Sequence, residues 1–188
     1  DAIIQFEKYK TLKPNDERAD IGIQSCLFAK NALQNQSRYE LSPFQHNSNQ
    51  DEYSPCYASR DYDEIFFTSS RDESLGKSKD GFSGNSFTDI YWSKYDNKKK
   101  RWSKPSSFEE PMNSGAHEAT PSINKRGNEF YFTRCMQNSN IKPIPTCEIY
   151  FSKKKGKSWI SPVLLPLPYD SISSFAHPSV SPNGKILY

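Results

Sequence analysis

The sequence has no long apolar run, since none of its hydrophobic segments approaches the roughly 20 residues that a membrane-spanning helix needs. Hydrophobic residues make up only 34% of the 188 residues, and the mean hydropathy is −0.86. The sequence therefore predicts no membrane span. The opening residues 1–4 are typical of a helix interior rather than a leader, and the closing residues 186–188 are typical of a strand interior. We therefore expect the sequence to be a fragment.

Signatures of enzymes and of cofactor binding are missing as well. The sequence has no P-loop, no dinucleotide-binding glycine pattern and no G-x-S-x-G nucleophile motif. Its histidines are His46, His117 and His177, and His117-Glu118 lacks the second histidine of a metalloprotease helix. No pair of carboxylates can be assigned to glycoside hydrolysis. We expect a protein that is not an enzyme and that holds no cofactor and no metal.

Cysteine is scarce and charge is nearly balanced. The four cysteines, Cys26, Cys56, Cys135 and Cys147, contain no C-x-x-C pair, which disfavours a zinc site, whereas their even number permits two disulfides. The 25 cationic residues face 22 anionic ones, for a net charge of +3. This balance gives no indication of a nucleic-acid partner.

Proline and glycine are nearly absent from the first 35 residues, where only Pro14 and Gly22 occur. Apolar residues recur there at steps of three and four, as in Ala2, Phe6 and Tyr9, which predicts one face of a helix. The segment Pro14-Asn15-Asp16 interrupts that pattern before a second apolar series begins. Residues 1–35 are therefore expected to form a helical hairpin.

The rest of the chain repeats itself. Three segments share a polar pair, a proline at a constant spacing after it, a turn and then an apolar strand. The pairs and their prolines are Asn47-Ser48 with Pro55, Asn113-Ser114 with Pro121, and Asp170-Ser171 with Pro178. The strands that follow the turns are residues 65–69, 130–134 and 186–188. So many agreements in register indicate a tandem repeat rather than chance.

The first two copies also share a second half. Asp89-Ile90-Tyr91 matches Glu148-Ile149-Tyr150, and each is followed by a basic turn that ends in a tryptophan, Trp102 or Trp159. The unit is therefore strand, tight turn, strand, variable loop, strand, basic turn, strand. Four strands in about 60 residues are typical of one propeller blade.

These patterns predict a mainly β fold, a partial β-propeller of four-stranded blades after a short α-helical hairpin. The predicted divisions are the hairpin over 1–35, the partial propeller over 36–188, an outer strand that closes the ring over 39–48, blade one over 51–114, blade two over 115–174 and the start of a third blade over 175–188. Because blades bury their faces against one another, we expect further blades beyond residue 188.

The repeat resembles the PD40 family of WD40-like propeller repeats, most closely in the run Pro182-Asn183-Gly184-Lys185-Ile186-Leu187-Tyr188. The hairpin around Pro14-Asn15-Asp16 is similar to a junction between tetratricopeptide repeats, although an ordinary amphipathic hairpin is the alternative. The combination resembles Bacteroidetes envelope proteins in which tetratricopeptide repeats, a PD40 propeller and an OmpA-like domain follow one another.

This resemblance implies a periplasmic scaffold, associated with the outer membrane, whose partners are other envelope or secretion-system proteins, including those of type IX secretion. Peptidoglycan would be bound only through the OmpA-like domain, which is not in this sequence. A periplasmic propeller of the TolB kind is an alternative. A sialidase-like or other glycan-binding propeller is another, because residues 152–159 resemble a sialidase Asp-box in which Lys154 replaces the aspartate.

Two cysteine pairings are considered. Cys135 and Cys147 lie at the end of one expected strand and the start of the next, where antiparallel neighbours come close enough for a disulfide. Closing a loop of about a dozen residues stabilises by roughly 3 kcal/mol in the chain-entropy model. Cys26 and Cys56 would join the second helix to the first blade. Free thiols are the alternative for both pairs.

Two kinds of loop are candidates for partner binding. The basic turns carry Lys98, Lys99, Lys100 and Arg101 in one copy and Lys153, Lys154 and Lys155 in the other. Lysine at hairpin tips is also an ordinary device for solubility, which is the simpler interpretation. The loop over residues 71–88, with Arg71, Asp72 and Asp80, is the long insertion of the first copy. Its acidic residues lack the spacing of an EF-hand.

Overall fold

The structure is a computed structural model. It describes residues 2–35, 38–76, 79–81, 83–136, 146–168 and 173–188. The chain divides into two compact units, residues 1–43 and residues 44–188, and each is described on its own.

The first unit is the expected helical hairpin, formed by α1 (Ala2–Leu12) and α2 (Arg18–Gln34). Gly22 lets the two helices approach closely, because a Cβ atom there would lie 2.5 Å from the ring of Phe6. The turn is held by Asp16, whose carboxylate accepts hydrogen bonds from the hydroxyl of Tyr9 and the guanidinium of Arg18. Neither described helix is long and apolar enough to cross a membrane. The assignment to tetratricopeptide repeats stays a prediction.

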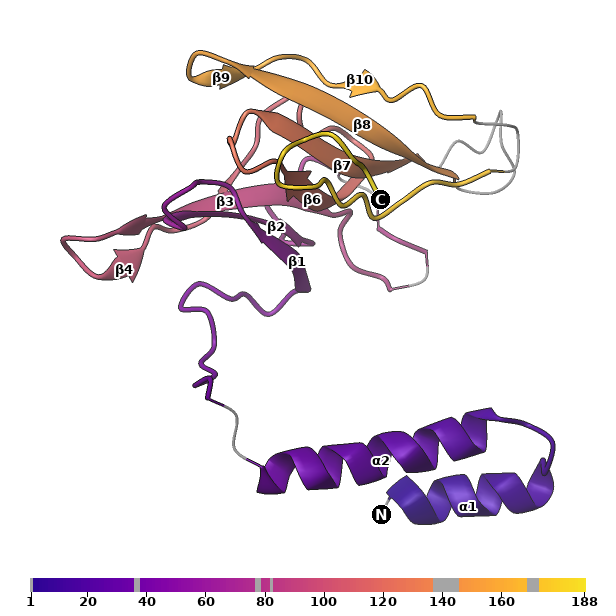
Figure 1. The fold of residues 1–188 in the computed structure, drawn as a ribbon. Coiled ribbons are helices and arrows are strands. Elements are labelled where there is room, and N and C mark those ends of the chain that lie inside the picture. Colours follow the sequence, from indigo (N-terminus) through magenta and orange to yellow (C-terminus); the bar gives the residue numbers. More distant parts are fainter. Residues whose placement is uncertain (1, 36–37, 77–78, 82, 137–145, 169–172) are drawn as a thin grey trace. The chain divides into compact units, whose positions relative to one another are not determined.

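The second unit is built from two antiparallel sheets (Figure 1). The first contains β1 (Glu52–Tyr57), β2 (Glu64–Ser69) and β3 (Asp89–Asp96), with β4 (Arg101–Trp102) and β5 (Ser106–Ser107) both paired to β3. The second contains β6 (His117–Ile123), β7 (Glu129–Met136) and β8 (Thr146–Lys155), with β9 (Ser158–Trp159) and β10 (Val163–Leu164) both paired to β8. The mainly β fold is as the sequence predicts. Each sheet has five strands rather than the predicted four, because two short strands follow the third strand of each copy, β4 and β5 in the first and β9 and β10 in the second.

Each copy has the same irregularity beside its proline. The pairing of β1 with β2 shifts between Tyr53 and Cys56, and that of β6 with β7 shifts between Ala119 and Ser122. The residue before each proline has a left-handed backbone, with φ of 50° at Ser54, 51° at Thr120 and 61° at His177. In the third copy a short hairpin follows, with a bridge between Val180 and Leu187. The repeat is therefore visible in the backbone as well as in the sequence.

The copies are also joined to one another by the same hydrogen bonds. In each junction a backbone N–H of the later copy donates to a threonine hydroxyl of the earlier copy, and a second N–H donates to a backbone carbonyl at the start of its third strand. In the first junction, the N–H of Thr120 donates to the hydroxyl of Thr68 at 2.9 Å, and the N–H of Glu118 donates to the carbonyl of Thr88 at 2.8 Å. In the second junction, the N–H of His177 donates to the hydroxyl of Thr133 and the N–H of Phe175 donates to the carbonyl of Cys147, both at 2.9 Å. Successive copies are therefore joined by equivalent hydrogen bonds.

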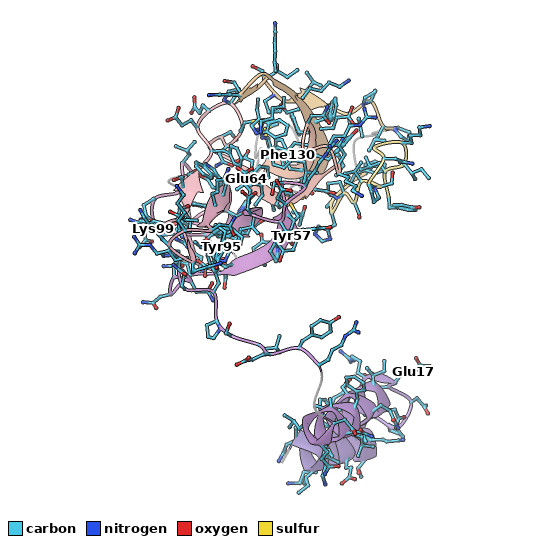
Figure 2. All side chains as sticks on the ribbon, turned by 60° about the vertical axis from the view of Figure 1, so that its left-hand side comes forward. Glu17, Tyr57, Glu64, Tyr95, Lys99 and Phe130 are labelled. Carbon is cyan, nitrogen blue, oxygen red and sulfur yellow. A yellow bond between two sulfur atoms is a disulfide. The ribbon has the colours of Figure 1, made fainter. Side chains whose placement is uncertain are left out.

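The hydrophobic core lies where the two sheets meet. Phe130, which is labelled in Figure 2, is fully buried. Its ring centroid lies 5.3 Å from that of Phe66 and 5.4 Å from those of Phe132 and Trp159. Phe66 comes from β2 of the first sheet, so this contact joins the two copies. Aromatic pairs at such distances prefer tilted or edge-to-face geometry, as these do.

Residues 39–48 are predicted to form an outer strand against a further blade, and that pairing stays a prediction. These residues carry no strand, and Leu41 is 93% exposed. A strand needs a neighbour to accept its backbone hydrogen bonds, and none of the described residues pairs with this segment. At its end, Phe44 instead packs its ring edge-on against Trp102 and Phe67, each at 6.0 Å.

The disulfide between Cys135 and Cys147 is confirmed. These residues are directly opposite each other in the pairing of β7 with β8. The bond therefore ties two neighbouring strands of the second sheet across the loop between them, at a sequence separation of 12.

Replacing Cys135 and Cys147 together by serine is expected to lower the free energy of unfolding of the β unit by about 3 kcal/mol, because the unfolded chain regains the freedom of the closed loop. Urea denaturation of the variant and the wild type measures the difference. Cys26→Ser, in the helical unit, is the control and should leave the β-unit transition unchanged. Alkylation of four thiols in the unreduced native protein would contradict the bond.

Cys26 and Cys56 carry free thiols in this structure. They belong to different units, so the second pairing stays a prediction. Cys56 packs against the buried cluster around Phe66 and Phe130. Burial raises the pKa of Cys56 to about 12, and a thiol that remains protonated is a poor nucleophile for disulfide exchange.

Candidate interaction surface

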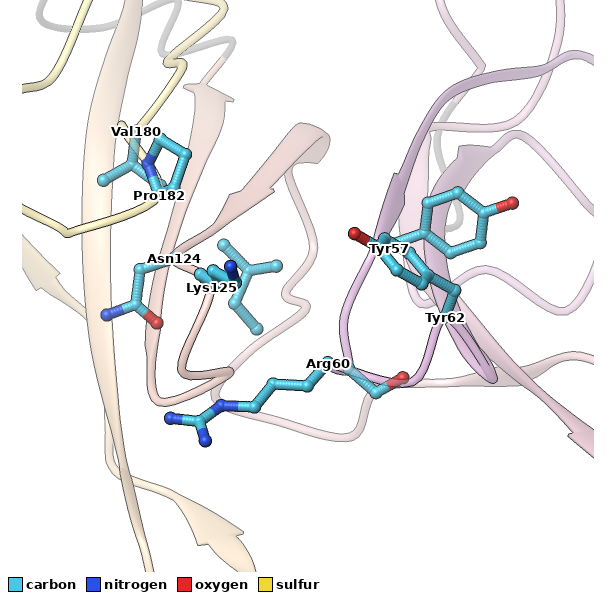
Figure 3. A pocket seen from close by; sticks show the side chains of 9 residues that line it. Tyr57, Arg60, Tyr62, Asn124, Lys125, Val180 and Pro182 are labelled. Atoms are coloured by element: carbon cyan, nitrogen blue, oxygen red, sulfur yellow. The ribbon is translucent and has the colours of Figure 1, made fainter.

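Three equivalent turns, one from each copy, meet around an open hollow of about 310 Å³ (Figure 3). The first turn supplies Tyr57, Arg60 and Tyr62, and the second supplies Asn124 and Lys125. The third turn closes the far side with Val180 and Pro182. The second and third turns are joined by a hydrogen bond of 3.0 Å from the N–H of Lys125 to the carbonyl of Pro182.

Two exposed tyrosines form one wall of the hollow. The rings of Tyr57 and Tyr62 are 5.0 Å apart and edge-to-face, at an interplanar angle of 85°. They are 56% and 65% exposed, respectively. An exposed aromatic pair with free hydroxyl groups is typical of protein interfaces, where tyrosine is enriched.

Tyr62 occupies a backbone position that the other copies give to glycine. Its φ is 56°, and the corresponding turns have Gly127 at 67° and Gly184 at 73°. A left-handed backbone at an aromatic residue costs about 1–3 kcal/mol, and such strain is concentrated at functional sites. The first copy therefore accepts a backbone cost that glycine would avoid, and the tyrosine ring is thereby placed on the wall of the hollow.

Cationic side chains line this hollow and a second one that shares Arg60, Lys125 and Pro182 with it. This second hollow of about 420 Å³ is lined by Arg60, Lys125, Arg126 and Lys185, together with Pro182 and Asn183. Among the residues that the structure describes, no acidic side chain lines either hollow. Across the described residues, no ion pair includes any of these four cations.

Two carboxylates on the same turns are already paired, whereas Asp61, which follows Arg60 on the first turn, is exposed. Asp63 lies 3.7 Å from the ammonium of Lys94, and Glu129 lies 3.8 Å from that of Lys153. A hydrogen bond from the hydroxyl of Ser59 also holds the pKa of Asp63 below its ordinary value. Asp63 and Glu129 therefore have cationic partners other than those of the hollow.

The loop residues predicted from sequence are placed differently from one another. Arg71, expected in an interaction loop, is instead buried, with only 8% of its surface exposed. Its guanidinium pairs with Glu52 at 3.1 Å and lies over the rings of Phe67 and Tyr91. Arg71 is therefore part of the interior and is not free to bind a partner.

The second copy has the same buried arrangement, built around Arg134. This guanidinium pairs with Glu118 and lies over the rings of Phe132 and Tyr150. In both copies the glutamate also accepts hydrogen bonds from the N–H and hydroxyl of the serine four residues before it. These pairs are Ser48 with Glu52 and Ser114 with Glu118.

The pKa values of the two glutamates shift in opposite directions. Burial opposes ionisation of Glu52, but hydrogen bonds from Ser48 and Ser69 and the charge of Arg71 outweigh it, so its pKa lies below the ordinary value. Burial is more complete at Glu118, which has no exposed surface, and it raises the pKa of that carboxyl despite Ser114 and Arg134.

The other loop candidates lie at the surface or beside it. Asp72 is exposed, whereas Asp80 is half-buried and its carboxylate lies 3.6 Å from the ring of His117. The basic turns are exposed, and Lys99 marks the first of them in Figure 2. Their exposed residues are Lys98, Lys99, Lys100 and Arg101, and Lys153, Lys154 and Lys155. Whether these turns bind a partner stays a prediction.

His117 has a structural environment. Its Nδ1 accepts a hydrogen bond from the N–H of Thr88 at 3.2 Å, and its ring lies 4.0 Å from that of Phe87. Burial lowers the pKa of His117, which favours the neutral ring that this bond requires. Within the described part of the chain, no three His, Cys, Asp or Glu side chains are grouped to hold a metal ion.

The hollow itself was not predicted from the sequence. Its residues belong to segments that the repeat identifies only as turns. The one available signal was Tyr62, a large residue where the other copies have glycine. Comparison with protein-family models, with curated proteins and with solved structures found no match to this chain.

Proposed function

We propose that residues 44–188 are part of a β-propeller of the PD40 type and that the protein is a non-enzymatic scaffold that binds other proteins. The observation that carries the proposal is the repeated junction, in which Thr120 bonds to Thr68 as His177 bonds to Thr133. Copies related by one repeated operation, each covering the face of the last, are the building principle of propellers.

The hollow between the turns is the proposed binding site, and an acidic peptide segment is its proposed ligand. Arg60, Lys125, Arg126 and Lys185 attract negative charge, while Tyr57 and Tyr62 offer aromatic surface and hydroxyl groups. Charge complementarity of this kind increases the rate of association and selects the partner. Loops on a rigid β scaffold are also the usual place for such sites.

The cellular setting is proposed on two grounds. The resemblance to envelope proteins favours a periplasmic scaffold near the outer membrane, similar to PorE of type IX secretion. The disulfide between Cys135 and Cys147 supports an oxidising compartment, because such bonds rarely persist in the cytosol. Partners would then be other proteins of the same envelope complex.

Binding of a short, fluorescein-labelled, glutamate-rich peptide tests the proposed site. The variant Arg60→Glu/Lys125→Glu is expected to bind this peptide at least tenfold more weakly than the wild type, because two attractive charges become repulsive. Fluorescence polarisation at low and high salt measures the affinities, and the wild-type affinity should fall as salt rises.

The matched control is Lys98→Glu/Lys99→Glu, which makes the same change in net charge on the exposed β3–β4 turn. It should retain nearly the wild-type affinity. Equal losses in the two variants would show that the peptide responds only to overall charge, and the hollow would then not be the site.

A glycan-binding propeller is the competing interpretation, and the Asp-box-like turn at 152–159 is its basis. Ser152 donates its hydroxyl proton to the carbonyl of Ile160 at 2.6 Å, and Ser93 does the same to Ser103 at 2.7 Å in the first sheet. The serine therefore holds the turn in both copies, which argues for an architectural role. Specific binding on a glycan array, without binding of the acidic peptide, would favour the sugar-binding alternative.

A further inference from the structure

Asn113 acts as a clamp on the backbone of a neighbouring strand. Its side-chain oxygen accepts the N–H of Ile90 and its side-chain nitrogen donates to the carbonyl of Ile90, both at 2.9 Å. The same nitrogen also donates to the carbonyl of Phe108 at 2.9 Å. Asn113 is fully buried. Its amide therefore satisfies both backbone groups of one residue of β3, beyond the end of β5.

Asn47 is the counterpart of Asn113 one copy earlier, and its loop is held in the same way. Ser48 bonds to Glu52 as Ser114 bonds to Glu118. The guanidinium of Arg71 donates to the carbonyl of His46, the residue before Asn47. Likewise, the guanidinium of Arg134 donates to the carbonyl of Met112, the residue before Asn113. The loop that carries the asparagine is therefore held by the same contacts in both copies.

The two asparagines differ in what they contact. Asn47 is exposed. Its N–H donates to the carbonyl of Phe44 at 3.1 Å, but its side-chain amide forms no hydrogen bond to the described residues. A side-chain amide has an NH₂ donor and an oxygen acceptor on the same side. It can therefore form hydrogen bonds to both the carbonyl and the N–H of one residue in an extended strand, as Asn113 does.

We propose that Asn47 clamps the third strand of a further copy of the repeat, at the residue equivalent to Ile90 and Ile149. The occupant is an extended segment in which an acidic residue is followed by isoleucine and tyrosine. The backbone N–H and carbonyl of that isoleucine are unpaired before the clamp binds them. This inference rests on the proposed propeller, since it adds a sheet before β1, but it does not depend on the hollow or its ligand.

The probe is a synthetic peptide with the sequence of residues 87–94, which contains Asp89-Ile90-Tyr91. Its addition to the full chain should shift the side-chain amide resonance of Asn47 and slow its hydrogen exchange, saturably. The amide of Asn113 is already buried and is the internal reference. A second peptide carries an N-methyl group on the isoleucine, which removes the donor that the clamp requires, and it should not bind.

Asn47→Ala and Asn47→Asp are both expected to weaken binding of the first peptide by roughly tenfold, because each removes at least the donor half of the clamp. Equal binding of the N-methylated peptide, or an unchanged Asn47 resonance, would overturn the inference. Protection of Asn47 that rises with protein concentration alone would overturn it in favour of self-association. Arg60→Glu/Lys125→Glu should leave this binding intact, which separates the clamp from the hollow.

Discussion

Replacing Phe130 by alanine is expected to lower the free energy of unfolding of the β unit by about 3–5 kcal/mol. Phe130 has no exposed surface and its ring contacts aromatic residues of both sheets, including Phe66. The truncation removes buried apolar area and leaves a cavity where the sheets meet. Because small domains are stable by only about 5–15 kcal/mol, the loss is a large part of the total.

Urea denaturation followed by tryptophan fluorescence measures this effect. Phe28→Ala is the matched control, since it makes the same chemical change at a residue that is 76% exposed in the helical unit. It should change stability by less than about 0.5 kcal/mol. Phe130→Leu keeps a large apolar side chain and should cost less than Phe130→Ala. If Phe130→Ala lowered the free energy of unfolding no more than Phe28→Ala does, Phe130 would not belong to the core.

Replacing Glu118 by alanine is expected to cost about 3–5 kcal/mol, because it leaves the largely buried guanidinium of Arg134 without its carboxylate. The side chain of Glu118 is fully buried and that of Arg134 is 13% exposed. The change also removes the acceptor for the N–H and hydroxyl of Ser114. The measurement is the midpoint and slope of the urea transition of the variant against the wild type.

Glu52→Ala is the internal comparison, because Glu52 holds the same place in the first copy. Its side chain is 13% exposed, so water can partly replace the lost contacts and the cost should be smaller. Glu118→Ala/Arg134→Met, which removes both charges, should recover part of the stability lost by Glu118→Ala. A Glu118→Ala variant as stable as the wild type would show that the pair does not stabilise the fold.

The order of strands could be predicted from the sequence because turn residues and prolines recur at fixed spacings. The buried arginines could not be found in this way. Arg134 lies directly opposite Glu118 in the strand pairing, whereas the residue opposite Glu52 is Ser69, and Arg71 comes two positions later. The two guanidinium groups thus reach equivalent places from different positions in the alignment. Only the path of the backbone brings them into correspondence.

Two predictions depend on contacts outside what one unit shows. Residues 39–48 carry the sequence pattern of an outer strand, but a strand forms only against a neighbour, and the neighbour predicted for it is a further blade. The pairing of Cys26 with Cys56 would join the two units of the chain, and it also stays a prediction. A local pattern therefore does not decide either outcome without its tertiary contact.

The bulges beside the repeated prolines have a consequence for aggregation. β1 and β6 are edge strands of their sheets, and each carries a proline after a left-handed residue, Pro55 after Ser54 and Pro121 after Thr120. Proline offers no N–H, and a bulge bends the edge away from a straight ladder. These two edges are therefore poor templates for strands of foreign chains.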